Sequence, residues 1–311
     1  MTFVLGVDGG NTKTLAAVAD ASGRTRGEGR AGTGDIYNAA TPDDAIAAIE
    51  AAVREALAIA GIAADELDAA VFSLAGADWP EDFTLLEAAL PERLGLAVAP
   101  LVVNDALGAL RGGSPDWTGI ALVSGTYNAV GARHPDGRVF HIGFWPDAAG
   151  GHELGREALH AVYRAALDMG PPTVLTERAL ALYGVGDPIA LLYEFTRRGG
   201  LGKHEKDRLA PVVLDAADEG DAVARAIVGE KGRVLGRQGR ACAEQLSLPL
   251  EGTRVVLAGG VFGHPTDRLA DAAMAELPGA VAVRHPAPPI EGALLLALDR
   301  ITEGRSAVWA G

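Results

Sequence analysis

The fold of this chain is decided by the stretch Phe3-Val4-Leu5-Gly6-Val7-Asp8-Gly9-Gly10-Asn11-Thr12-Lys13-Thr14-Leu15-Ala16-Ala17-Val18-Ala19-Asp20 near its start. Two apolar runs flank a polar turn, which predicts a hairpin of two strands. Gly9 and Gly10 let backbone N–H groups approach an anion closely, and the side chains of residues 12–14 add donors. Asp8, at the end of the first strand, could hold a metal ion beside that anion. By itself the turn is equally typical of an ordinary hairpin loop.

Composition narrows the class of protein. The chain has 311 residues, 49% of them hydrophobic, which is enough for a large core and more than one domain. Its formal net charge of −14 argues against nucleic acid or an anionic membrane as the main partner, because both attract basic surfaces. No charged leader and no long apolar segment is evident, so a cytosolic protein is expected. The single cysteine, Cys242, excludes an internal disulfide or a thiolate metal centre within the chain and predicts a packed core thiol.

The second half of the chain repeats features of the first. Residues 119–133 again read as strand, Gly/Thr turn and strand. Residues 254–261 echo residues 71–77, since in each a strand ends in Leu-Ala-Gly. Two features in the same order indicate an internal duplication.

This duplication predicts an α/β protein of two similar domains with a cleft between them. We expect the first domain at residues 1–113 and the second at residues 114–311. A long, mostly helical stretch over about residues 154–246 predicts an insertion in the second domain. Residues 27–38 are rich in glycine and polar side chains, so they are expected to form a loop, whose end could contact a ligand.

Asn104 and Asp105 follow a strand predicted over residues 97–103 and precede a helix that begins at Ala106. Ligands of α/β proteins usually bind at the carboxyl ends of the strands. An ionised Asp105 at that edge could accept the proton of a substrate hydroxyl. Capping of the following helix is a competing use of the same oxygen atoms. Asn104 could simply brace the turn.

The motifs together resemble those of a known family. Two halves, each opened by a Gly/Thr hairpin loop, are similar to the RNase H-like domains shared by actin, Hsp70 and sugar kinases. Within that fold the chain resembles the N-acetylglucosamine kinase and BadF/BadG/BcrA/BcrD ATPase family over nearly its whole length. Five motifs carry the resemblance: Gly6-Val7-Asp8-Gly9-Gly10-Asn11-Thr12-Lys13-Thr14 and Ser124-Gly125-Thr126 with Asn128 (phosphate loops), Val103-Asn104-Asp105-Ala106 (catalytic aspartate), Leu257-Ala258-Gly259-Gly260-Val261 (adenosine motif) and Pro289-Ile290-Glu291-Gly292-Ala293 (closing motif).

The resemblance implies an ATP-dependent kinase that phosphorylates the 6-hydroxyl of an amino sugar, with N-acetylglucosamine as the expected substrate. It implies Asp105 as the base and Mg²⁺ near Asp8, and it favours a homodimer. The implied ATP-binding residues are Gly9, Gly10, Asn11, Thr12, Lys13, Gly125, Thr126, Gly259 and Gly260. The implied substrate-binding residues are Asn38, Asp78, Asn104, Asp105, Thr126, Asn128 and Asp147, with Trp145 as a candidate cover for an apolar sugar face.

The chain departs from the family pattern at two places. Tyr127 follows Thr126 directly, so the second phosphate loop lacks a glycine, and glycines around Asp147 are replaced. Thr126 and Asn128 could instead cap the backbone of their own hairpin. These departures leave open a second hypothesis, a nucleotide- or sugar-binding regulator without catalysis. A third, the activating ATPase of a 2-hydroxyacyl-CoA dehydratase, would need two cluster-binding cysteines per subunit, and Cys242 is alone.

Overall fold

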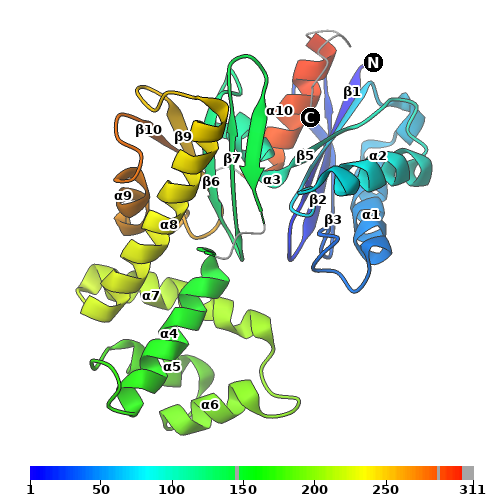
Figure 1. The fold of residues 1–311 in the computed structure, drawn as a ribbon. Coiled ribbons are helices and arrows are strands. Elements are labelled where there is room, and N and C mark those ends of the chain that lie inside the picture. Colours follow the sequence, from blue (N-terminus) through cyan, green and yellow to red (C-terminus); the bar gives the residue numbers. More distant parts are fainter. Residues whose placement is uncertain (144–146, 286–287, 303–311) are drawn as a thin grey trace.

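The computed structural model describes residues 1–143, 147–285 and 288–302, which contain two five-stranded sheets (Figure 1). In the first sheet the order is β3 (Thr25–Ala31), β2 (Thr14–Asp20), β1 (Phe3–Gly9), β4 (Ala69–Leu74) and β5 (Leu101–Asn104). In the second it is β8 (Val139–Ile142), β7 (Asn128–Arg133), β6 (Gly119–Ser124), β9 (Arg254–Ala258) and β10 (Val281–Arg284). Each sheet has three antiparallel strands followed by two parallel ones. The predicted duplication is therefore confirmed.

The helices divide into three groups. Two cover the outer face of the first sheet: α1 (Pro42–Ala60) and α2 (Pro80–Leu94). Two lie between the sheets: α3 (Asp105–Gly113) and α10 (Ile290–Thr302). The predicted insertion holds α4 (Gly151–Ala166), α5 (Leu175–Tyr183), α6 (Pro188–Thr196), the 3₁₀ helix η2 (Lys203–Arg208), α7 (Leu209–Glu219) and α8 (Ala222–Leu246), and α9 (Arg268–Met274) follows β9. A short 3₁₀ helix, η1 (Ala64–Glu66), precedes β4.

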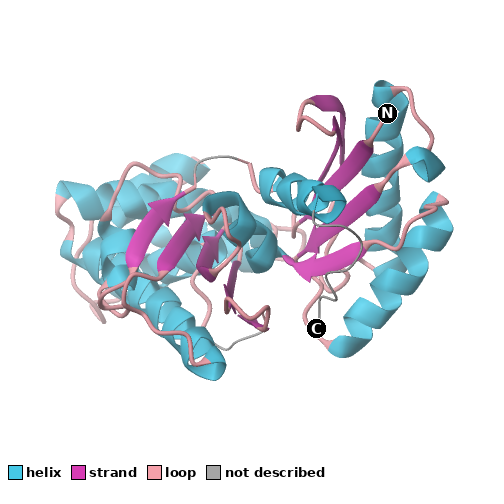
Figure 2. Cartoon of the chain, turned by 90° about the horizontal axis from the view of Figure 1, so that it is seen from above, coloured by secondary structure: helices cyan, strands magenta, loops and turns pink. Residues whose placement is uncertain are grey.

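Helices α3 and α10 join the two halves. Figure 2 shows the two sets of strands side by side, each flanked by helices. A buried apolar cluster between them takes side chains from both sheets and from both helices. Arg111 on α3 donates to both carboxylate oxygens of Asp299 on α10, at 2.6 and 3.0 Å. Helix α10 also packs on β1, where a Cβ on Gly6 would lie 2.6 Å from the backbone nitrogen of Leu294.

Strand β3 corrects one expectation. Residues 27–31 were expected to be loop, but they are part of an edge strand that pairs with β2. The glycines are there because α1 crosses the strand very closely. A Cβ on Gly27 would lie 2.2 Å from the carbonyl oxygen of Ala56, and one on Gly29 would lie 2.0 Å from that of Ala52. Close backbone approach, rather than a turn, explains this glycine-rich sequence.

The register of the first sheet brings three strand ends to one edge. Gly9 pairs with Leu74, and Leu74 pairs with Asn104. The strands β1, β4 and β5 run parallel, so the chain leaves each of them at the same edge. Such carboxyl edges are the usual ligand sites of α/β sheets. Of the helices that the structure describes, none has the length and apolar character that crossing a bilayer requires.

Candidate active site

Asp105 lies at this edge with one carboxylate oxygen unpaired. Asn104, fully buried at the end of β5, is the N-cap of α3, because its Oδ1 atom accepts from the backbone nitrogen of Ala106 at 3.1 Å. Asp105 is then the first residue of the helix, and its Oδ1 atom is buried with no hydrogen-bond partner. The capping role that competed for Asp105 thus belongs to Asn104. A buried carboxylate oxygen without a partner calls for an explanation, and a ligand donor would supply one.

The charges at the edge act on one another. Burial raises the pKa of Asp105 to about 6, with the carboxylate of Asp35 adding to the effect. The pKa of Asp8, at the end of β1, is raised further, to about 7. Burial is the largest cause and the Asp105 charge the next, while Lys13 lowers this pKa. Like charges held close in a poorly solvated place disfavour ionisation. Perturbed carboxyl groups of this kind are typical of functional sites.

Asp78 belongs to the same group. Its Oδ1 atom accepts from the Nδ2 atom of Asn104 at 3.0 Å. Burial raises the pKa of Asp78 to about 7, and the charges of Asp105, Asp35 and Asp82 contribute. Asn104 therefore does brace the turn, but it also links Asp78 to the first turn of the helix that carries Asp105.

Asp35 is a member of the acidic edge that sequence reasoning missed. It lies in the loop after β3, is 6% exposed, and accepts at Oδ1 from the backbone nitrogen of Tyr37 at 2.9 Å. A Cβ on Gly76, in the turn after β4, would lie 2.9 Å from that same oxygen. The sequence predicts that this loop could contact a ligand, and the resemblance points to Asn38 within it, but neither indicates Asp35. The missed signal was an acidic residue directly after Gly-Thr-Gly.

The first phosphate loop is an ordered turn between β1 and β2. The backbone nitrogen of Gly10 donates to the carbonyl of Lys13 at 3.0 Å, and the side chains of Thr12 and Lys13 are exposed. Asn38 supports this loop, because its Nδ2 atom donates to the carbonyl of Asn11 at 2.7 Å. Thr14 was expected to offer a donor to an anion, but it is fully buried and donates to the carbonyl of Gly32 instead.

The second phosphate loop, between β6 and β7, rests on the start of α4. The carbonyl of Gly125 accepts from the backbone nitrogen of Gly151 at 2.8 Å, and the carbonyl of Thr126 accepts from that of His152 at 2.9 Å. The ring of Tyr127 lies 5.4 Å from the ring of His152. The Tyr127 pKa is raised by burial and by nearby carboxylates, one of them Asp35 in the other half of the molecule.

Asn128 has a structural role in the described contacts. Its Oδ1 atom accepts from the backbone nitrogen of Ala149 at 2.8 Å, and its Nδ2 atom donates to Gln238 at 3.0 Å. Gln238 on α8 in turn donates to the carbonyl of Asp147 at 2.7 Å. Both ends of the Asn128 amide therefore hold the chain that leads into α4. The role is structural, but the partners lie outside the hairpin that the capping alternative named.

Asp147 is exposed and lies beside α8. Besides the bond from Gln238 to its carbonyl, its carboxylate contributes to the raised pKa of Arg237, whose main partner is Glu230. These contacts associate Asp147 with the second half of the molecule, whereas Asp8, Asp78 and Asp105 come from the first. Trp145 lies outside the described residues.

The adenosine motif adjoins the second phosphate loop. The backbone nitrogen of Val261 donates to the carbonyl of Ser124 at 2.9 Å. Gly259 has a φ of +93°, and a Cβ there would lie 2.5 Å from that same carbonyl oxygen. A Cβ on Gly260 would meet open space. The two glycine motifs of the second half thus lie side by side, with the backbone of Gly259 packed directly against Ser124.

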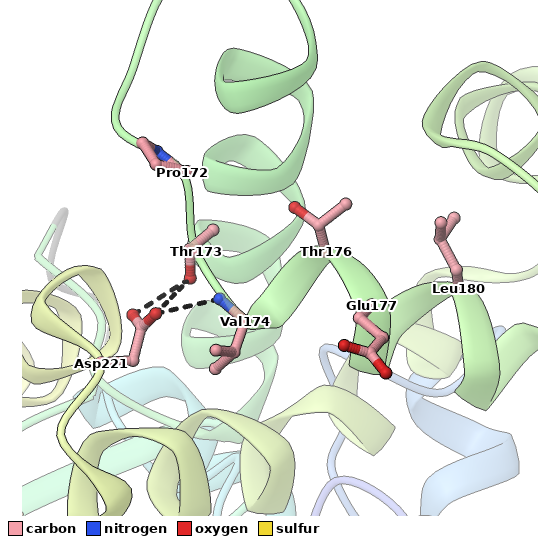
Figure 3. Close-up of a pocket in the computed structure, with 7 residues that line it drawn as sticks. All are labelled: Pro172, Thr173, Val174, Thr176, Glu177, Leu180 and Asp221. Atoms are coloured by element: carbon pink, nitrogen blue, oxygen red, sulfur yellow. Dashed lines mark hydrogen bonds between the residues drawn. The ribbon is translucent and has the colours of Figure 1, made fainter.

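A separate depression of about 590 Å³ lies in the helical insertion (Figure 3). It is lined by Pro172, Thr173, Val174, Thr176, Glu177, Leu180 and Asp221. The Asp221 carboxylate is already engaged by the Thr173 hydroxyl, by the backbone nitrogen of Val174 and by that of Ala224. These bonds give Asp221 a structural role as the N-cap of α8, so the acidic edge remains the candidate site.

Cys242 is a core thiol, as predicted. It is fully buried on α8, and its Sγ atom lies 3.9 Å from the carbonyl oxygen of Val130. Burial raises its pKa to about 12. A thiol in such a place is poorly suited to metal binding or redox chemistry, because both need the thiolate.

Known proteins match the chain over most of its length. A curated N-acetylmuramic acid/N-acetylglucosamine kinase of Clostridium acetobutylicum is 30% identical over 268 residues, which cover 85% of this chain and 87% of the relative. An N-acetyl-D-glucosamine kinase of Dictyostelium discoideum is 25% identical, with 95% and 97% covered. The solved structure of a putative N-acetylglucosamine kinase from Chromobacterium violaceum has a TM-score of 0.68 and 26% identity, and covers 96% of this chain and 99% of its own. Residues 5–297 match the model of the BadF/BadG/BcrA/BcrD ATPase family, so the chain belongs to that family.

Proposed function

We propose that the protein is an ATP-dependent sugar kinase that transfers the γ-phosphate of ATP to the 6-hydroxyl of an amino sugar, with N-acetylglucosamine as the substrate. The observation that carries this proposal is the buried, unpartnered Oδ1 atom of Asp105 at the carboxyl edge of the first sheet. The names of two curated relatives support the choice of sugar, since both include N-acetylglucosamine, and one of them also includes N-acetylmuramic acid.

Asp105 serves as the general base. The 6-hydroxyl oxygen forms a bond to the γ-phosphorus, the bond from that phosphorus to the β–γ bridging oxygen breaks, and ADP leaves with the bonding electrons. The proton of the hydroxyl passes to the Asp105 carboxylate. A pKa of about 6 suits this role, because the group is mostly ionised at neutral pH and yet more basic than an ordinary aspartate.

ATP is held between the two halves. The backbone of residues 9–13 and that of Gly125 and Thr126 bind the phosphates, with Lys13 offsetting charge. Gly259 and Gly260 lie along the adenosine. In this proposal Asp78 and Thr126 contact the sugar, together with Asp35 and, less directly, Asp147. Asn38, Asn104 and Asn128 act mainly by holding the loops around it.

Mg²⁺ is the expected companion of ATP, and Asp8 is the residue that would hold it. Among the described residues no three His, Cys, Asp or Glu side chains are arranged to hold a metal ion. A single buried carboxylate nevertheless fits Mg²⁺, which keeps several waters and takes the rest of its ligands from substrate phosphates. When bound, the ion would offset phosphate charge. Asp8 itself would be held ionised, against the burial that raises its pKa to about 7.

A coupled assay of ADP release against a panel of amino sugars tests the proposal. We expect release to depend on the sugar and N-acetylglucosamine to give the highest kcat/KM. Asp105→Asn should lose about 10²–10⁴-fold in kcat, the usual contribution of a general base, while still binding ATP. Asp116→Asn, which removes a carboxylate remote from the edge, is the control. ATP turnover that is equal with and without sugar would refute kinase activity, and normal ligand binding without turnover would favour a sensor.

A further inference from the structure

The two halves also meet beside the acidic edge, where β8 reaches the loop after β4. The Nε2 atom of His141, on β8, lies 3.1 Å from the carbonyl oxygen of Asp78. The ring of Phe83, in the first turn of α2, meets the His141 ring edge-on at a centroid distance of 6.2 Å. A residue of the second sheet is therefore in direct contact with a residue of the proposed sugar site.

This contact fixes the protonation of the His141 ring. A carbonyl oxygen only accepts hydrogen bonds, so the Nε2 atom must carry a proton and donate it. Burial lowers the pKa of His141 below its ordinary value. At neutral pH the ring is thus neutral with its proton on Nε2, a state in which it can hold the main chain of Asp78 without adding charge to the acidic edge.

Gly143 lies against Asp78 from the same side. It directly follows β8, and a Cβ there would lie 2.1 Å from the Oδ1 atom of Asp78 and 2.9 Å from its Oδ2 atom. The backbone of the second half can lie against the carboxylate only because this residue has no side chain. Asn104 completes the arrangement by donating to Asp78 Oδ1 at 3.0 Å.

We propose that His141 is a positioning residue of the sugar site, which fixes Asp78 from the second half of the molecule. The inference rests on the proposed kinase activity. Asn104 bonds to Asp78 and caps the helix of Asp105, so a displacement of Asp78 is passed to the base. The sugar site is then complete only when β8 lies where the structure has it, whereas the phosphate loops do not depend on His141.

Three variants test this role. His141→Ala removes the donor. His141→Gln keeps an N–H donor at nearly the same reach. Phe140→Ala changes a partly exposed neighbour on the opposite face of β8 and is the matched control. In His141→Ala we expect the KM for the sugar to rise about tenfold, the scale of one lost hydrogen bond, with the KM for ATP unchanged. His141→Gln should recover most of the loss, and Phe140→Ala should match wild type.

A second measurement needs no activity. The backbone nitrogens of Asp78 and Trp79 both donate to Asp82 Oδ2, so amide hydrogen exchange in this turn reports its order. Without ligands, exchange there should be faster in His141→Ala and restored in His141→Gln. A wild type without sugar-dependent turnover would refute the kinase proposal alone. Unchanged sugar KM and unchanged exchange in His141→Ala would overturn the positioning role. An equal rise of the KM for sugar and the KM for ATP, seen in both the Ala and the Gln variant, would overturn it as well.

Discussion

Asp105→Asn should make the protein more stable as it makes it less active. Folding raises the pKa of Asp105 from the ordinary 3.8 to about 6. Each pKa unit corresponds to about 1.4 kcal/mol, so keeping this group ionised in the fold costs up to about 3 kcal/mol. Asparagine has nearly the same shape and carries no charge. At pH 8 the variant should therefore gain about 2–3 kcal/mol in free energy of unfolding.

The stability difference between Asp105→Asn and wild type should depend on pH. Below pH 3.8 the carboxyl group is protonated in both the folded and the unfolded chain, so its charge costs nothing. Between pH 3.8 and about 6 the unfolded chain ionises first, and the stability of wild type falls relative to that of the variant. Above about pH 6 both states are ionised and the difference stays at its full value.

Urea unfolding of both proteins at pH 8 and near pH 4 measures the effect. Asp136→Asn is a control of opposite sign, since bonds to Arg138 and His134 lower the pKa of that exposed group to about 2. An Asp105→Asn variant no more stable than wild type at pH 8 would show that the carboxylate is well compensated in the fold. A gain that stayed the same near pH 4 would show that charge is not its cause.

Three further predictions concern the neighbourhood of the site. Lys13→Met should raise the pKa of Asp8 above about 7, because the Lys13 charge lowers that pKa. The acidic limb of the kcat/KM–pH profile should then move to higher pH, and a limb that does not move would contradict the coupling between Lys13 and Asp8. Asn104→Ala removes the N-cap of α3 and should cost about 1–2 kcal/mol in urea unfolding, whereas a loss of activity without any loss of stability would argue against the capping role. Gly29→Ala should lower the free energy of unfolding by about 1–3 kcal/mol, because the added Cβ overpacks against α1. Gly32→Ala, where a Cβ meets open space, should leave it nearly unchanged.

Much of the architecture is readable in the sequence, because glycine motifs and apolar runs recur in the same order. The placement of Asp105 after a strand follows from the same local pattern. What could not be predicted depends on partners far along the chain. Asn128 is tied to Gln238, 110 residues away, and Asp35 joins the acidic edge only because its loop folds back onto Gly76. The glycines of β3 look like a loop until α1 is placed against them.

The position of α10 also constrains how the protein reaches its fold during synthesis. This helix packs on β1, so residues 3–9 are covered by residues 290–302, which are synthesised much later. Until residues 290–302 have left the ribosome, one apolar face of the first sheet lacks the part of its cover that α10 supplies. Domains of a growing chain usually fold in order from the N-terminus. Here the packing of the first sheet is completed only after residues 290–302 have been synthesised, so its apolar strands stay exposed for longer than their early place in the chain would suggest.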